Sequence, residues 1–181
     1  MKLLKLIVLP ALLLSSLVVL NSCESDAEMD RTTDFEKKDI VMSPAQEPQG
    51  LAVPSTGIGK MDVFYTKDTR TLTYKVTWSG LTDSIVGMHI HGLAPVGYNA
   101  AIVQHIISGV GASSGTNSGQ YSAQFTATGP YRFSKSGSIS GTMPVDEVVI
   151  KEQDLLNGMY YLNIHTKANP GGEIRGQIVF Q

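Results

Sequence analysis

The sequence predicts an all-β domain: an antiparallel β-sandwich or a Greek-key barrel with one short helical turn. Polar and apolar residues alternate over several short stretches, which is the pattern of half-buried strands. The chain of 181 residues also contains 18 glycines and 8 prolines, and many of these separate the alternating stretches as turns. The stretches do not alternate with long helical segments, so a parallel α/β fold is not expected.

The clearest strands are predicted at residues 60–65 and 71–78, joined by a hairpin loop at residues 67–70. The only helical signal lies at residues 151–158, where Gly158 would end the helix in a left-handed conformation. Residues 145–150 fit either a strand or a loop. Further strands are predicted at 85–91, 101–108, 120–128, 137–142, 160–166 and 173–180.

The first residues indicate export and lipid attachment. Lys2 and Lys5 precede an apolar run over residues 6–20, and Cys23 follows after small and polar residues. This order is typical of a secretory signal, and it resembles the lipobox of bacterial lipoproteins. The resemblance implies cleavage before Cys23 and acylation of its thiol by palmitate-like chains. A transmembrane anchor is the alternative, although a spanning helix needs about 20 apolar residues.

Three parts of the chain are therefore predicted. Residues 1–22 form a lipoprotein signal peptide, residues 23–38 an acidic flexible tether, and residues 39–181 the β-domain. The tether is dense in charge and poor in apolar residues, so it is not expected to build a core. We expect the mature protein to be lipid-anchored to a membrane of the cell envelope, with the outer membrane favoured.

Composition excludes several classes of protein. The chain has 14 basic and 16 acidic residues, which does not suit a nucleic-acid-binding surface. Its single cysteine excludes an intramolecular disulfide framework and a cysteine-rich zinc module. A G-x-S-x-G match occurs at residues 111–115, but it lies in a Gly- and Ser-rich stretch that is expected to be a loop, and not at the strand-to-helix turn that the nucleophile of many serine hydrolases requires. We therefore expect no catalytic residues.

Histidines supply the candidate metal ligands. His89 and His91 form an H-x-H pair, and the period of a strand places both rings on one face. His165 ends a second alternating stretch, and a neighbouring strand would bring it beside the pair. Imidazoles suit copper or zinc. The alternative is that these histidines make hydrogen bonds within a polar sheet face and bind no metal. We interpret His105 as a surface or hydrogen-bonded residue rather than a ligand.

A second candidate site lies near the C-terminal end. Pro170 and Gly171 suit the centre of a type II turn. Glu173 and Arg175 then lie on one face of the following strand. They would form an ion pair or a clamp on the carbonyl of a neighbouring loop. The alternative is that Arg175 anchors an anion beside the histidines.

Three motifs resemble the CHRD domain, the module named after chordin. They are MHIHGLAP at residues 88–95, LLNGMYYLNIHT at residues 155–166 and PGGEIRGQ at residues 170–177. The resemblance extends over residues 39–181. It implies an all-β extracellular domain and does not imply a known reaction.

These observations lead to two expectations about function. The first is a lipid-anchored, non-catalytic binding or structural module that contacts a protein or glycan partner. The second is a copper- or zinc-binding protein that uses His89, His91 and His165. In its boldest form the second is similar to copper/zinc superoxide dismutase, with Arg175 attracting superoxide.

Overall fold

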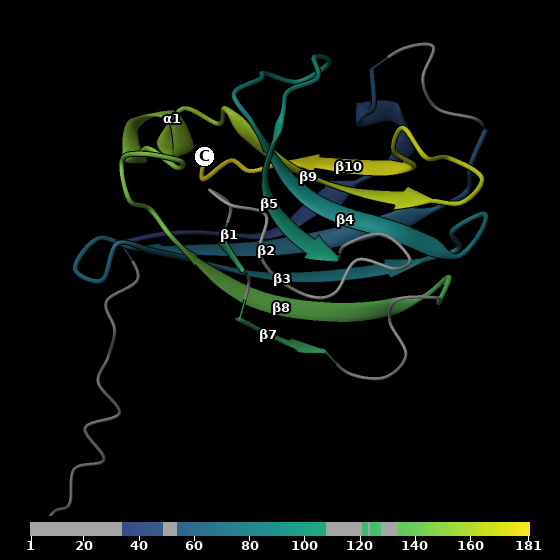
Figure 1. The fold of residues 1–181 in the computed structure, drawn as a ribbon, viewed down its shortest axis with the longest axis horizontal. Coiled ribbons are helices and arrows are strands. Elements are labelled where there is room, and N and C mark those ends of the chain that lie inside the picture. The colour runs from purple at the N-terminus through teal and green to yellow at the C-terminus, as the bar shows by residue number, and fades with distance from the viewer. Residues whose placement is uncertain (1–33, 49–53, 108–120, 123, 128–133) are drawn as a thin grey trace, which may run out of the picture. The chain divides into compact units, whose positions relative to one another are not determined.

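The predicted all-β sandwich is confirmed by the computed structural model, which describes residues 34–48, 54–107, 121–122, 124–127 and 134–181. These residues form two five-stranded sheets (Figure 1). In chain order the elements are β1 (Phe35–Met42), the 3-10 turn η1 (Pro44–Gln46), β2 (Ile58–Thr66), β3 (Thr71–Ser79), β4 (Ile85–Gly92), β5 (Ile102–Ile107), β6 (Tyr121–Ser122), β7 (Gln124–Ala127), β8 (Gly137–Pro144), α1 (Glu152–Leu156), β9 (Tyr160–Thr166) and β10 (Ile174–Gln177).

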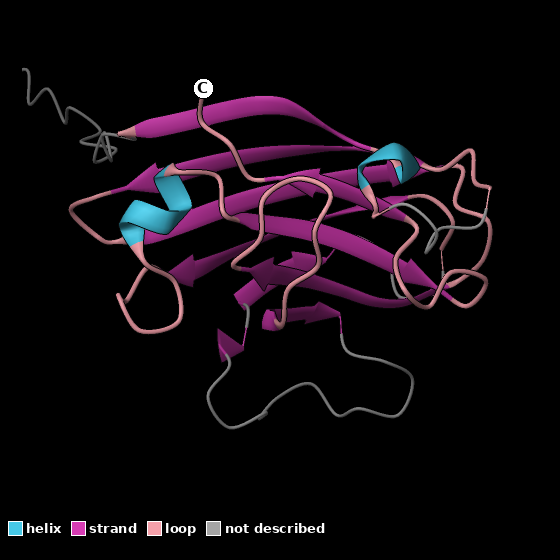
Figure 2. Ribbon diagram, turned by 90° about the horizontal axis from the view of Figure 1, so that it is seen from above, coloured by secondary structure: helices cyan, strands magenta, loops and turns pink. Residues whose placement is uncertain are grey.

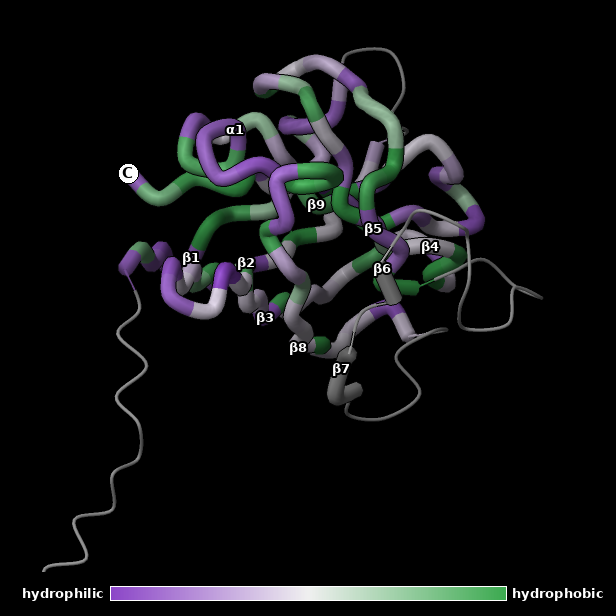
Figure 3. Tube along the Cα trace, turned by 60° about the vertical axis from the view of Figure 1, so that its left-hand side comes forward, coloured by the Kyte–Doolittle hydropathy of each residue, from purple (hydrophilic) through white to green (hydrophobic). Residues whose placement is uncertain are grey.

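The first sheet has the strand order β1-β2-β3-β8-β7, and the second has the order β10-β9-β4-β5-β6. Neighbouring strands are antiparallel except β5 and β6, which are parallel. The sheets lie in two layers, one above the other in Figure 1, and Figure 2 looks down onto them from above. Buried apolar side chains from both layers form one core, to which β3 contributes Val76, β4 contributes Ile90 and β9 contributes Leu162. Hydrophobic residues accordingly occur along strands of both sheets (Figure 3).

The β2–β3 hairpin follows the predicted pattern. Its register pairs Thr66 with Thr71, so residues 67–70 form the loop. Buried and less buried residues alternate along both strands. Arg70 closes the loop with a φ of 48°. The α1 helix also lies where it was expected, and Gly158 follows it with a φ of 69°. The 3-10 turn η1 was not predicted.

Strand β1 begins at Phe35, within the segment that the sequence predicts as a tether. Phe35 pairs with Tyr65 and stacks on its ring, and it also contacts Phe180 edge-on. The charged residues that follow belong to the edge of a sheet, where charge discourages pairing with other chains. A bulge at Asp39, which has a φ of 57°, breaks the alternation that would otherwise reveal the strand.

The structure also clarifies two other segments. The strand predicted at 120–128 contains two short strands in different sheets, since β6 pairs with β5 and β7 pairs with β8. Residues 145–150 form a loop, because the Asp146 carboxylate accepts hydrogen bonds from the backbone N–H groups of Val148, Val149 and Ile150. Side-chain competition of this kind favours turns over strands.

The signal peptide and Cys23 lie outside the described residues. Within the part of the chain that the structure describes, no helix has the length and apolar character needed to cross a membrane.

The outer face of the second sheet is covered rather than open. All residues of β9 except His165 are buried, so both faces of this strand are enclosed. The loop between β4 and β5 lies over one part of the face, where the Ala94 N–H donates to the Met159 carbonyl. The segment around η1 lies beside β10, where Ser43 forms a bridge with Arg175. Polar side chains of the second sheet are thus enclosed under these segments.

Candidate metal centre

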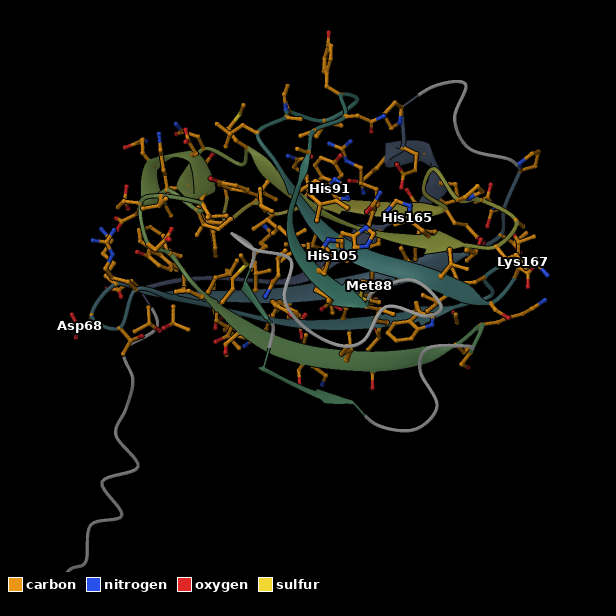
Figure 4. All side chains as sticks on the ribbon, viewed as in Figure 1. Asp68, Met88, His91, His105, His165 and Lys167 are labelled. Atoms are coloured by element: carbon orange, nitrogen blue, oxygen red, sulfur yellow. The ribbon has the colours of Figure 1, made fainter. Side chains whose placement is uncertain are left out.

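Three histidines lie together on the outer face of the second sheet. His89 and His91 point outward from β4, while Ile90 between them is in the core. The antiparallel register of β4 and β9 pairs His165 with Gly87, one position diagonally from His89. The sequence predicted that the three rings share a face if the strands are neighbours, and the register makes them neighbours. Figure 4 shows His91 and His165 close together above the sheet.

The distances among the rings suit a shared ion. One ring nitrogen from each of His89, His91 and His165 lies within 4.8 Å of the others. The ring centroids are 4.7 Å apart for His89 and His165, 5.6 Å for His89 and His91, and 6.0 Å for His91 and His165. A tetrahedral ion bound at about 2.0–2.1 Å needs nitrogens roughly 3.3 Å apart. Small rotations of these side chains would close the remaining gap.

Backbone carbonyls determine which nitrogens are free. His91 donates from Nδ1 to the Ala100 carbonyl at 2.9 Å, and His165 donates from Nδ1 to the Pro170 carbonyl at 2.9 Å. A carbonyl only accepts, so each Nδ1 carries the proton and each Nε2 keeps a lone pair. Metal-binding histidines are commonly oriented by this kind of second contact.

The free nitrogens are buried and lack hydrogen-bond partners. His91 Nε2, His165 Nε2 and His89 Nδ1 all belong to this group. Buried polar atoms without a partner are rare in folded proteins, so a concentration of them in one place calls for an explanation. A bound cation would satisfy these lone pairs.

Burial also keeps the three rings neutral. Burial and, to a smaller extent, the neighbouring histidines together lower the pKa of His89 to about 2. Burial likewise lowers the pKa of His91 and of His165, and it outweighs the hydrogen bonds to Ala100 and Pro170, which act in the opposite direction. Only neutral imidazole coordinates a metal, so the cluster does not need to lose protons at neutral pH.

His105 lies next to the cluster on β5. It pairs with His89 in register, and the two ring centroids are 4.7 Å apart. It is not one of the three residues whose ligand atoms lie within mutual reach. The sequence does not reveal this proximity, because the β4–β5 pairing contains register shifts on either side of the His89–Ile90 pair.

Two further residues of the site were missed. Tyr161 stacks on His91 with ring centroids 4.9 Å apart and an interplanar angle of 5°. Gly87 lies beside the His89 ring, where a Cβ atom would come within 2.9 Å of Cε1. The sequence could have indicated Tyr161, because it lies an even number of residues from His165 and therefore shares its face of the strand. The role of Gly87 depends on a cross-strand contact that the sequence does not reveal.

Arg175 is enclosed beneath the β4–β5 loop. Its side chain is 0% exposed and donates to the carbonyls of Tyr98 and Pro95 at 2.7 and 3.1 Å, and to Gln177 Oε1 at 2.8 Å. Its guanidinium carbon lies 3.4 Å from the centre of the Tyr161 ring. These contacts are those of a clamp on a loop. They leave the guanidinium no direct access to an anion in solution.

Glu173 has a separate set of partners. Its carboxylate accepts hydrogen bonds from the Ser55 hydroxyl at 2.6 Å, from the backbone and hydroxyl of Thr82 at 2.7 and 2.9 Å, and from the Thr166 hydroxyl. Burial alone would raise the pKa of Glu173. The hydrogen bonds outweigh burial and hold the pKa below its ordinary value. Glu173 therefore ties two loops to the end of β10 as a charged group.

The fold and the site together define an all-β sandwich with a three-histidine cluster on one covered face. The chain matches the CHRD domain family over residues 39–178 and belongs to that family. Comparisons with curated proteins and with solved structures gave no match. Membership in the family supports a role as a binding or structural module.

The Glu173 network can be tested through stability. Glu173→Gln replaces one acceptor oxygen by an amide that faces hydroxyl and N–H donors. We expect it to lower the free energy of unfolding by about 1–3 kcal/mol at pH 7. Because the folded-state pKa is lowered, the contribution of the carboxylate is present above the unfolded pKa and is lost as the pH falls through the folded value. Denaturant titration should therefore show a smaller difference in the free energy of unfolding between the wild type and Glu173→Gln at pH 3 than at pH 7.

The matched control is Glu36→Gln, which alters an exposed acid on the edge strand β1. It should leave stability nearly unchanged at both pH values. Equal stability of the Glu173→Gln protein and the wild type at pH 7 would contradict the assigned role of this carboxylate.

Proposed function

We propose that this protein is a lipid-anchored module of the cell envelope that binds one transition-metal ion, copper or zinc, between His89, His91 and His165. The observation that carries the metal-binding role is the convergence of three neutral imidazoles, each with a buried ring nitrogen that lacks a hydrogen-bond partner. Two of the rings are already fixed through Nδ1 by backbone carbonyls. A binding site prepared in this way loses little conformational entropy when the ion arrives.

The ligand set favours particular ions. Three imidazoles without a thiolate suit copper and zinc better than magnesium or calcium, which prefer oxygen ligands. The proposal is for binding rather than catalysis. A site similar to superoxide dismutase would use Arg175 to attract the substrate anion, and the enclosed position of Arg175 argues against that version.

The full-length protein purified in detergent should bind one Cu²⁺ or Zn²⁺ per chain, measured by calorimetry and by elemental analysis after dialysis. The double variant His89→Ala/His91→Ala should lose this binding because it removes two of three ligands. His105→Ala is the matched control and should keep one ion per chain. Metal should also raise the melting temperature of the wild type, because it binds only the folded state. A wild-type protein that holds no metal and melts unchanged would contradict the proposal.

Gly87→Ala tests the same site without removing a ligand. The added methyl group would lie within 2.9 Å of the His89 ring and displace it. We expect metal affinity to fall about tenfold or more, in line with changes to groups that orient ligands. The melting temperature in the presence of a chelator should change little, because the imidazole can rotate away. Wild-type affinity in this variant would show that the ring position seen here is not the binding position.

Lipid attachment is supported by the sequence around Cys23 alone. Cys23→Ser removes the thiol that would be acylated. In cells fed labelled palmitate, the wild type should carry label and sediment with membranes, whereas Cys23→Ser should do neither. Ser25→Ala, a change just beyond the lipobox, is the control and should behave as the wild type. Label and membrane association that survive Cys23→Ser would overturn the anchoring proposal.

A further inference from the structure

Asn163 occupies the centre of the candidate metal centre. On β9 it lies between Tyr161 and His165, and in register it faces His89 on β4. Its neighbours across and along the sheet are therefore the three histidines of the cluster and the ring that stacks on one of them. The side chain is 2% exposed, so its polar atoms depend on protein partners or on a bound group.

The oxygen of Asn163 has no such partner. Asn163 Oδ1 is buried without a hydrogen bond, as is Nε2 of His91. The Asn163 side chain nevertheless raises the pKa of His91, as an oxygen that accepts a hydrogen bond from the protonated ring would, so it lies beside the ring. His91 carries its proton on Nδ1, so both facing atoms are acceptors. Two buried lone pairs that face each other without a donor are unfavourable unless a cation lies between them.

The orientation of the Asn163 amide is set from behind by Glu47. This acid follows η1 and is 5% exposed; burial raises its pKa to about 7, against the opposing effects of Arg175 and of a hydrogen bond with the Asn163 side chain. A hydrogen bond that lowers the pKa of an acid is one that its ionised form accepts, so the amide NH₂ group faces Glu47. The amide oxygen then faces the histidines. The assignment of the amide oxygen and nitrogen of Asn163 thus follows from its hydrogen-bond partner.

We infer that Asn163 Oδ1 is the fourth protein ligand of the metal, and that Glu47 positions it. This inference rests on the proposed metal-binding function. The resulting set of three imidazole nitrogens and one amide oxygen has the number of ligands that a tetrahedral ion takes. The oxygen ligand favours a divalent ion, Zn²⁺ or Cu²⁺, over Cu⁺, which prefers sulfur ligands. Glu47 acts through Asn163 as the carboxylate that commonly stands behind a metal ligand.

Asn163→Ala removes the oxygen and should lower the affinity of the full-length protein for Zn²⁺ at least tenfold, measured by competition with a chromophoric chelator. With Co²⁺ as a spectroscopic substitute, the visible bands of the variant should differ from those of the wild type, because water replaces the amide. Asn157→Ala, at an exposed asparagine after α1, is the matched control and should leave both readouts unchanged.

A double variant separates loss of the ligand from loss of the fold. Glu47→Gln/Asn163→Asp exchanges carboxylate and amide, so the new amide can donate to the new carboxylate while an oxygen still faces the metal. We expect Zn²⁺ affinity at or above that of the wild type and a four-coordinate Co²⁺ spectrum. Folding of each variant is checked by its melting temperature in chelator, and the double variant still decides the matter if Asn163→Ala does not fold.

The outcomes distinguish the two proposals. A wild-type protein that binds neither Zn²⁺ nor Co²⁺ removes the metal-binding function and this inference with it. A wild type that binds both, together with a folded Asn163→Ala protein of unchanged affinity and unchanged Co²⁺ spectrum, overturns the fourth ligand alone. Failure of the folded double variant to bind metal would likewise overturn the role of the oxygen.

Discussion

The hydrogen bonds from the buried guanidinium of Arg175 to the β4–β5 loop hold the cover over the outer face of the second sheet. A buried cation is costly unless its donors are satisfied, and here carbonyls of the β4–β5 loop accept from it. The loop is consequently held over the strands. The same loop supplies the Ala100 carbonyl that orients His91, and the Ala100 N–H donates to the Tyr161 hydroxyl. Stability of the loop and orientation of a candidate ligand therefore share one cause.

Covering a polar sheet face creates a strict requirement for hydrogen bonds. Arg175 donates three hydrogen bonds to oxygen atoms, and Glu173 accepts from Ser55, Thr82 and Thr166. Buried polar atoms that lack a hydrogen-bond partner are therefore informative. Several buried atoms without partners belong to His89, His91, Asn163 and His165, which are neighbours on two strands. A group of unpartnered, buried polar atoms on neighbouring residues of two strands is the arrangement of a cation site.

The register of β4 and β9 makes this arrangement possible. A slip of one residue would turn every side chain of β9 to the opposite face and move His165 into the core. The correct register is favoured because Leu162 and Ile164 then lie in the core opposite Ile90 and Met88. Apolar packing inside the sandwich thus positions the polar cluster outside it, and the site needs no separate element of structure to assemble.

The sequence alone determined the all-β class, the β2–β3 hairpin, the faces of His89 and His91, and the family, because these depend on local alternation and on short motifs. It did not indicate strand β1, because the charged residues of this edge strand resemble a linker and its bulge hides the alternation. Only the tertiary structure decided that β9 lies beside β4, that Arg175 contacts a loop and not an anion, and that Asn163 faces the histidines. Those facts depend on strand order and on loops that cover the sheet, and both arise from contacts between residues far apart in the chain.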